Sequence, residues 1–178
     1  MSNFLEIDIK GYKASLPILE LPSGVKIAFF NLHGAPEMTE HCGKEIAKLV
    51  TADVIITAES KGLQLAHVVA RELNHPFYAV ARKSKKLYMQ DGVSISYGSS
   101  ITTGKAQELH LSKHDVDVIK GKKVAIVDDV ISTGESLKGL EEIVKKAGGI
   151  VYEKLFVLAE GDAKDRKDVK FLQSIPLM

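Results

Sequence analysis

Two adjacent carboxylates, in the stretch VAIVDDVISTGES at residues 124 to 136, are the side chains best suited to chemistry. Asp128 and Asp129 follow a run of apolar residues and precede a segment rich in Ser, Thr and Gly. Neighbouring like charges repel, and each resists burial unless a partner offsets it. We therefore interpret the pair as the end of a buried strand that faces a ligand rich in hydroxyl groups and phosphate.

The polar segment after the acids has the composition of an anion-binding loop. It is expected to lie between a strand and the first turn of a helix, where free backbone N–H groups and the positive helix end converge. Hydrogen bonds to a charged group contribute about 1.5 to 3 kcal/mol each, so five or six donors can hold a sugar phosphate without a dedicated cation. A simple helix cap is the alternative, but one Asp or Ser would suffice for that. The candidate phosphate-binding residues are Ser132, Thr133, Gly134, Glu135 and Ser136.

The elements that must position these residues alternate along the chain. Apolar runs at 54–58, 77–81 and 151–159 read as strands, and helical patterns lie between them. Such alternation predicts an α/β fold with a parallel sheet covered by helices on both faces. Ligands of these sheets bind beyond the carboxyl ends of the strands, so the turns after Ala58, Ala81 and Val127 are expected at one site. A hairpin around residues 22–24, and two strands at 93–97 and 108–111 that flank a polar loop, complete the pattern.

Composition narrows the classes of function. With 178 residues, 45% hydrophobic and 26% charged, the chain has the profile of one globular domain with no membrane span. Its start does not resemble a secretory signal, so we expect a cytoplasmic protein. The net charge of +1, with no basic cluster beyond residues 82–86, argues against nucleic acid as a partner. Cys42 is expected to be a small core residue.

Three segments, in order along the chain, resemble a known family. The stretch VAIVDDVISTGES resembles the phosphoribosyl pyrophosphate signature of type I phosphoribosyltransferases, AESKG at 58–62 is similar to their pyrophosphate loop, and ARKSKK at 81–86 resembles a basic segment of the adenine enzymes. The resemblance implies an α/β core at 36–178 and an N-terminal hood at 1–35 that contains a β-hairpin and selects the base.

The same resemblance implies a role for each matching residue. Asp128 and Asp129 would meet the ribose hydroxyls and the shell of a magnesium ion that is held through the substrate rather than by the protein directly, while residues 132–136 hold the 5-phosphate. Pyrophosphate would lie against Ser60, Lys61 and Gly62. The basic residues that would approach the phosphates, some of them from a neighbouring subunit in a homodimer, are Arg82, Lys83 and Lys86.

A mobile loop over the site is expected between the strands at 93–97 and 108–111. The family carries a Tyr-Gly pair there, and both Tyr97-Gly98 and Thr103-Gly104 compete for that position. Tyr97 is the candidate catalytic residue, although a cross-strand aromatic that continues the alternation of Val93 and Ile95 is an equal alternative.

The reaction implied is transfer of ribose 5-phosphate from phosphoribosyl pyrophosphate to a purine, most simply adenine, with release of pyrophosphate. A 6-oxopurine, that is xanthine, hypoxanthine or guanine, is the alternative substrate. A regulator that senses phosphoribosyl pyrophosphate without catalysis is a second alternative. The third is a phosphoacceptor signalling domain, but its acids would end the first strand and not a late one.

Overall fold

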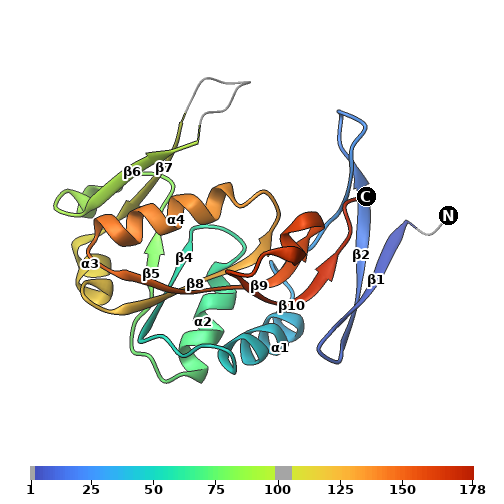
Figure 1. Ribbon diagram of the computed structural model, residues 1–178, viewed down its shortest axis with the longest axis horizontal. Coiled ribbons are helices and arrows are strands. Elements are labelled where there is room, and N and C mark those ends of the chain that lie inside the picture. The colour runs from blue at the N-terminus through green and yellow to red at the C-terminus, as the bar shows by residue number, and fades with distance from the viewer. Residues whose placement is uncertain (1–2, 99–105) are drawn as a thin grey trace.

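The computed structural model describes residues 3–98 and 106–178 and shows a sheet between helices, with a separate N-terminal sheet at one side (Figure 1). No helix in these ranges is long and apolar enough to cross a membrane. The strands are β1 (Phe4–Ile9), β2 (Tyr12–Glu20), β3 (Lys26–Ala28), β4 (Val54–Ala58), β5 (Ala79–Ala81), β6 (Val93–Tyr97), β7 (Gln107–Leu111), β8 (Lys123–Ile131), β9 (Ile150–Glu160) and β10 (Lys170–Ile175). The helices are α1 (Pro36–Ala47), α2 (Leu63–Glu72), α3 (Lys113–Ile119) and α4 (Glu135–Lys146), with short 3-10 turns η1 (Leu87–Met89) and η2 (Gly161–Asp165).

The central sheet confirms the predicted α/β fold. Within the described residues it has five parallel strands in the order β10-β9-β8-β4-β5. Helices α1 and α2 cover one face, and α3 and α4 cover the other (Figure 1). Strand β8, which carries the two acids, is the middle strand, so its carboxyl end is flanked on both sides by the ends of other strands.

Alternating side chains of the central strands enter two different cores. Ile55 and Val127 belong to the cluster under α1 and α2, whereas Ile56 and Ile126 belong to the cluster under α3 and α4. This is the pattern of a parallel sheet buried on both faces, because successive side chains of a strand point to opposite sides. Cys42 lies in the first cluster and is fully buried, as predicted, and burial raises the pKa of its thiol to about 12.

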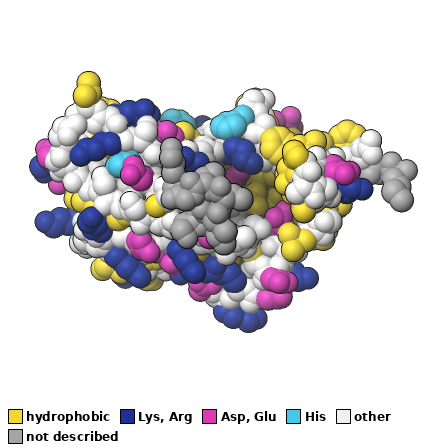
Figure 2. All heavy atoms as spheres, turned by 90° about the horizontal axis from the view of Figure 1, so that it is seen from above, with side chains coloured by type: hydrophobic (Ala, Val, Ile, Leu, Met, Phe, Trp, Pro, Cys, Tyr) yellow, Lys and Arg dark blue, Asp and Glu magenta, His cyan; other side chains and the backbone are white. Residues whose placement is uncertain are grey.

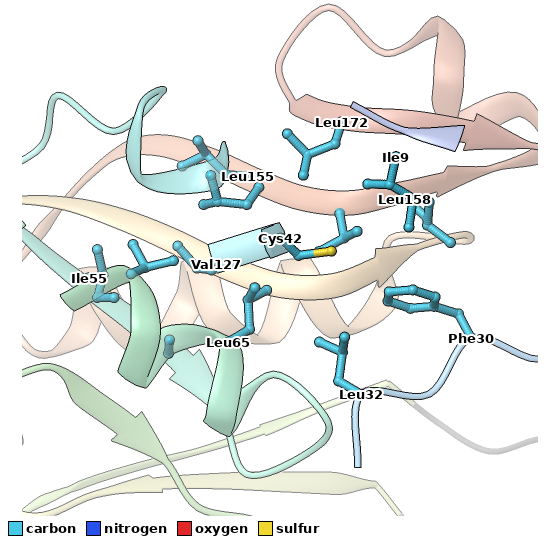
Figure 3. Packing of buried hydrophobic residues seen from close by; sticks show 14 of the residues in the cluster. Ile9, Phe30, Leu32, Cys42, Ile55, Leu65, Val127, Leu155, Leu158 and Leu172 are labelled. Atoms are coloured by element: carbon cyan, nitrogen blue, oxygen red, sulfur yellow. The ribbon is translucent and has the colours of Figure 1, made fainter. Parts of the chain in front are cut away.

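The N-terminal sheet is anchored in the first of these cores. Strands β1, β2 and β3 form an antiparallel sheet, and the predicted hairpin around residues 22–24 joins β2 to β3. Ile9, Phe30 and Leu32 reach the cluster around Cys42 (Figure 3) and are almost completely buried. Burial of side chains of this size contributes about 1.5 to 3 kcal/mol each, so the hood is held against the core by substantial apolar contact.

Strands β6 and β7 form a ribbon beside the edge strand β5 and join it through a bridge in which the backbones of Arg82 and His110 exchange hydrogen bonds. They pair with each other as an antiparallel ribbon and contact α4. The loop between them falls in residues 99–105, so the predicted mobile loop and the alternative Thr103-Gly104 register lie outside the described residues.

Candidate functional site

The two acids lie inside strand β8, which corrects the expectation that the strand ends at them. Pairing of β8 with β4 stops at Ile126, but pairing with β9 continues as far as Ile131. Pairing with the long strand β9 therefore keeps the backbone of the acids extended. Within the described residues, no strand pairs with the other edge of β8 at this point. Asp128 is 8% exposed and Asp129 is 7% exposed, so both carboxylates are nearly withdrawn from water.

Burial makes the acid pair electrostatically costly. Burial, reinforced by the negative charge of Asp129, raises the pKa of Asp128 to about 7. One compensating contact is the backbone N–H of Asp129, which donates to Asp128 Oδ1 at 2.8 Å. Carboxyl groups with strongly raised pKa values are typical of functional sites, because a fold gains little from burying two neighbouring acids.

The loop after β4 packs directly against the acid pair. The Ser60 hydroxyl lies 3.5 Å from Asp128 Oδ1, at the limit of a hydrogen bond. A Cβ atom at position 62 would lie 2.6 Å from both Asp128 Oδ1 and Thr57 Oγ1, so a side chain there would force both of these groups to move. The structure thus brings two segments of the predicted site into contact.

Lys61 joins three parts of the site. Its Nζ lies 3.3 Å from Asp129 Oδ2, donates to the carbonyl oxygen of Phe30 at 2.7 Å and lies 5.1 Å from the centre of the Phe29 ring. The ion pair lacks hydrogen-bond geometry, so within the described residues the buried Asp129 Oδ2 accepts no hydrogen bond. Lys61 therefore links the acid pair to the N-terminal sheet as well as offering a cation to an anionic ligand.

The segment 132–136 forms the predicted turn before a helix. Gly134 has a φ of 85°, a left-handed conformation that favours glycine. As the N-cap residue of α4 it supplies no capping side chain, and the N–H of Glu135 donates only weakly, at 3.5 Å, to the Thr133 hydroxyl. A cavity of about 140 Å³ borders the turn and is lined by Asp128, residues 130–137, Leu140 and Phe156. The side chains of Ser132, Thr133, Glu135 and Ser136 are exposed around it. Uncapped N–H groups and hydroxyls beside a cavity are the chemistry of phosphate binding.

The basic segment after β5 is only partly joined to the acid pair. The guanidinium of Arg82 pairs with Glu59 of the loop after β4 and donates to the Tyr88 hydroxyl at 2.8 Å. Lys83 is exposed and borders an open hollow with Gln107 and Glu108, and Lys86 is half-buried. Within the described residues, neither lysine contacts the acids.

Tyr97 packs on the first turns of α4. A Cβ atom at Gly139 would lie 2.8 Å from the Tyr97 ring, which shows how closely the ring covers the helix. The Tyr97 hydroxyl donates to Gln107 Oε1 at 2.8 Å, and Gln107 is its cross-strand partner. This cross-strand position of Tyr97 is one of the two alternatives that the sequence left open. A catalytic role for Tyr97 stays a prediction.

Four residues near the site were missed from sequence. Glu59 holds Arg82, and the fully buried Thr57 has a hydroxyl without a hydrogen-bond partner in the described chain. Glu160 accepts from the Ser132 hydroxyl at 2.9 Å, and Arg166 lies against Gly134. Glu160 could have been found, because it ends the apolar run of β9 just as the acids follow the run of β8. The other three are ordinary polar residues whose importance depends on distant contacts.

The donor set of the site suits a metal held mainly by its substrate. In the described part of the chain, no three His, Cys, Asp or Glu side chains are grouped so that they could bind a metal by themselves. Asp128 and Asp129 nevertheless offer two carboxylates, and Asp129 Oδ2 is short of a hydrogen-bond donor. Magnesium prefers oxygen ligands and commonly takes most of them from water and substrate phosphates, so the residues present fit such an ion.

Figure 2 shows the hollow between the core and the N-terminal sheet, with hydrophobic side chains at its bottom. The site combines an acid pair, a turn with the chemistry of phosphate binding, and a lysine that touches both the acids and the segment directly after β3.

Comparison with known proteins agrees with this geometry. The phosphoribosyl transferase domain model matches residues 31–176. Xanthine phosphoribosyltransferase of an Exiguobacterium species is 34% identical over 148 residues, which cover 78% of this chain and 75% of that protein. Adenine phosphoribosyltransferase of Methanococcus maripaludis is 33% identical over 140 residues, 76% of each chain. In fold, the chain is similar to the crystal structure of adenine phosphoribosyltransferase from Thermoanaerobacter pseudethanolicus, with a TM-score of 0.70, 23% identity and coverage of 90% of this chain and 95% of that one.

Proposed function

The chain belongs to the phosphoribosyl transferase family, and we propose that it transfers ribose 5-phosphate from phosphoribosyl pyrophosphate to a nitrogen of a purine base. The observation that carries this proposal is the contact of three segments at the carboxyl ends of β8 and β4. The buried acids, the loop at 60–62 and the turn at 132–136 meet there. Each has the chemistry required by one part of the donor.

The acids suit the ribose. Carboxylate oxygens accept hydrogen bonds from the two ribose hydroxyls, and their negative charge stabilises positive charge that develops on the sugar ring as the bond to pyrophosphate breaks. Asp128 and Asp129 are already desolvated, which strengthens this interaction because water no longer screens it. Magnesium, when bound with the donor, would neutralise part of the pyrophosphate charge.

The two loops suit the two phosphate groups. The uncapped N-terminus of α4 and the hydroxyls of Thr133 and Ser136 would hold the 5-phosphate. Lys61, with the backbone around Gly62, would hold the pyrophosphate on the other side of the acids. In the transfer, the bond from ribose C1 to a pyrophosphate oxygen breaks and a bond to the purine nitrogen forms. The base loses the proton of that nitrogen, and pyrophosphate leaves with the electron pair.

The identity of the base is the finer part of the proposal. We place adenine first, as the sequence suggested, and xanthine, hypoxanthine or guanine second. Proteins similar to this chain are named for adenine and for xanthine. The hood residues next to Lys61, Phe29 and Phe30, present an aromatic ring and a carbonyl oxygen, and both can contact a flat heterocycle. We further propose that the protein works in the cytoplasm as a homodimer.

The test is pyrophosphate release with phosphoribosyl pyrophosphate, magnesium and each of the four purines in turn. If kcat/KM is highest with adenine, the full proposal is supported. If it is higher with xanthine, hypoxanthine or guanine, the transfer reaction is supported, but that purine and not adenine is the substrate. Tight binding of phosphoribosyl pyrophosphate by calorimetry without turnover on any purine would contradict the enzyme and favour a sensor. Scattering in solution tests the homodimer separately.

A further inference from the structure

We propose that Arg166, in the turn between η2 and β10, is a further binding residue for the 5-phosphate group of the donor. This inference rests on the proposed function, because it assumes that the turn at 132–136 binds a phosphate. The starting observation is its position. Arg166 Nη1 lies 2.5 Å from the point where a Cβ atom of Gly134 would be, so the guanidinium occupies the space that a side chain at this turn would fill.

The guanidinium is held in this place by other contacts. Arg166 Nε donates to Asp168 Oδ1 at 2.9 Å and Nη2 donates to Asp168 Oδ2 at 2.7 Å. Asp168 also pairs with Lys154 at 3.1 Å, and Lys154 in turn pairs with Glu141 of α4. The two-point contact fixes the plane of the guanidinium and leaves Nη1 directed at Gly134. Little side-chain freedom would remain to be lost on binding an anion.

Among the described residues, the cavity beside the turn has acidic side chains in its lining but no basic ones. In the described chain, the cavity beside the turn is lined by the carboxylates Asp128 and Glu135 and by no Lys or Arg. A sugar phosphate carries up to two negative charges, and the end of a helix supplies only about half a positive charge. The phosphate would therefore meet a surplus of negative groups. Arg166 does not line this cavity, but within the described residues it is the cation that the structure places against Gly134 of the turn. This differs from the expectation that no dedicated cation is needed.

A purely structural role is the competing explanation, in which Arg166 only fixes the turn after η2 through Asp168. The two roles differ in their ligand dependence. A phosphate-binding residue affects ligands that carry the 5-phosphate and leaves pyrophosphate binding unchanged. A structural residue would affect stability, and either all ligands together or none.

The experiment compares Arg166→Gln and Arg166→Lys with the wild type and with the matched control Lys164→Gln, which removes an exposed cation from η2. Calorimetry measures the affinity for phosphoribosyl pyrophosphate, ribose 5-phosphate and pyrophosphate. We expect Arg166→Gln to weaken binding of the first two ligands by about ten- to a hundredfold, the range for a hydrogen bond to a charged group, and pyrophosphate by less than about twofold. Arg166→Lys should lose less, and Lys164→Gln should match the wild type.

A second measurement uses the wild-type chain, so that it does not depend on the folding of a variant. Ribose 5-phosphate should protect Arg166 from phenylglyoxal, detected by mass spectrometry of the peptide, whereas pyrophosphate should not. Unchanged affinity of Arg166→Gln for ribose 5-phosphate, or equal modification of Arg166 with and without it, would overturn the inference while the proposed function stands. Failure of the wild type to bind phosphoribosyl pyrophosphate or ribose 5-phosphate would overturn both.

Discussion

Replacement of Asp128 by asparagine should change how the stability of the protein depends on pH. The pKa of Asp128 is raised from 3.8 to about 7 in the folded chain. Between these values the folded protein keeps a proton that the unfolded chain has released. The stability that this group contributes is therefore fully present below about pH 4 and is lost as the pH rises through about 7. An asparagine side chain cannot ionise, so the variant should lack this dependence.

The magnitude follows from the two pKa values. For a single group that titrates at about 3.8 unfolded and about 7 folded, linkage predicts a loss of about 2.5 kcal/mol in the free energy of unfolding between about pH 5 and about pH 8. Burial and the charge of Asp129 both oppose ionisation of this carboxyl group, which fixes the sign of the change.

Urea unfolding at several pH values measures the difference. Relative to the wild type, Asp128→Asn should gain about 2.5 kcal/mol on going from pH 5 to pH 8, while losing phosphoribosyl pyrophosphate binding and turnover. Asp91→Asn, which alters an exposed acid, is the control and should keep the wild-type profile. If the free energies of wild type and Asp128→Asn run parallel across this range, then Asp128 is not a buried acid with a raised pKa and the electrostatic account of the site is wrong.

Two further variants test the loop after β4. Lys61→Met removes the cation beside Asp129. It should lower stability at pH 8 by about 1 to 2 kcal/mol, since the ion pair is partly exposed, and should also weaken pyrophosphate binding. Lys164→Met, which alters an exposed lysine with no role in the proposed site, is the control and should do neither in urea unfolding and calorimetry. Gly62→Ala should cost about 1 to 3 kcal/mol of stability, because the added methyl group would crowd Asp128 and Thr57. Backbone strain does not add to this cost, since alanine readily adopts the φ of −77° found at this position. An alanine variant as stable as the wild type would show that this contact is not tight.

The regular parts of the fold were predictable because their signals are local. The apolar run at 54–58 is strand β4 as expected. One of the helical patterns between the strands is α4, in which Leu137, Leu140 and Val144 are buried, and the left-handed Gly148 follows its end. Helix α3 was missed, although Ser112 and Asp115 form a reciprocal cap that the sequence displays at the usual spacing.

Other features depend on neighbours that the sequence does not reveal. The extension of β8 beyond the acids is imposed by pairing with β9. The strands predicted at 93–97 and 108–111 gave no sign that they would form a ribbon of their own beside the central sheet. Strands β1 and β10, which were not predicted, lie at the edges of their sheets. The apolar residues of β10 do not alternate regularly, whereas in β1 Leu5, Ile7 and Ile9 alternate with acidic residues, so β1 could have been found from the sequence.

The order of strands explains why the acid pair is a more conspicuous motif in the sequence than the cations that surround it. The acids are adjacent in one chain segment on β8, the middle strand, and so they form a conspicuous motif. The cations come one at a time from the segments that follow the flanking strands: Lys61 after β4, Arg82 after β5 and Arg166 after β9 and η2. Each one alone resembles an ordinary surface charge. The order β9-β8-β4-β5 brings the segments that carry them to the same edge of the sheet as the carboxylates, where different groups of one ligand can be bound together. Single substitutions of these cations should therefore weaken binding of different groups of the donor and not of the donor as a whole, which is why ribose 5-phosphate and pyrophosphate must be measured separately.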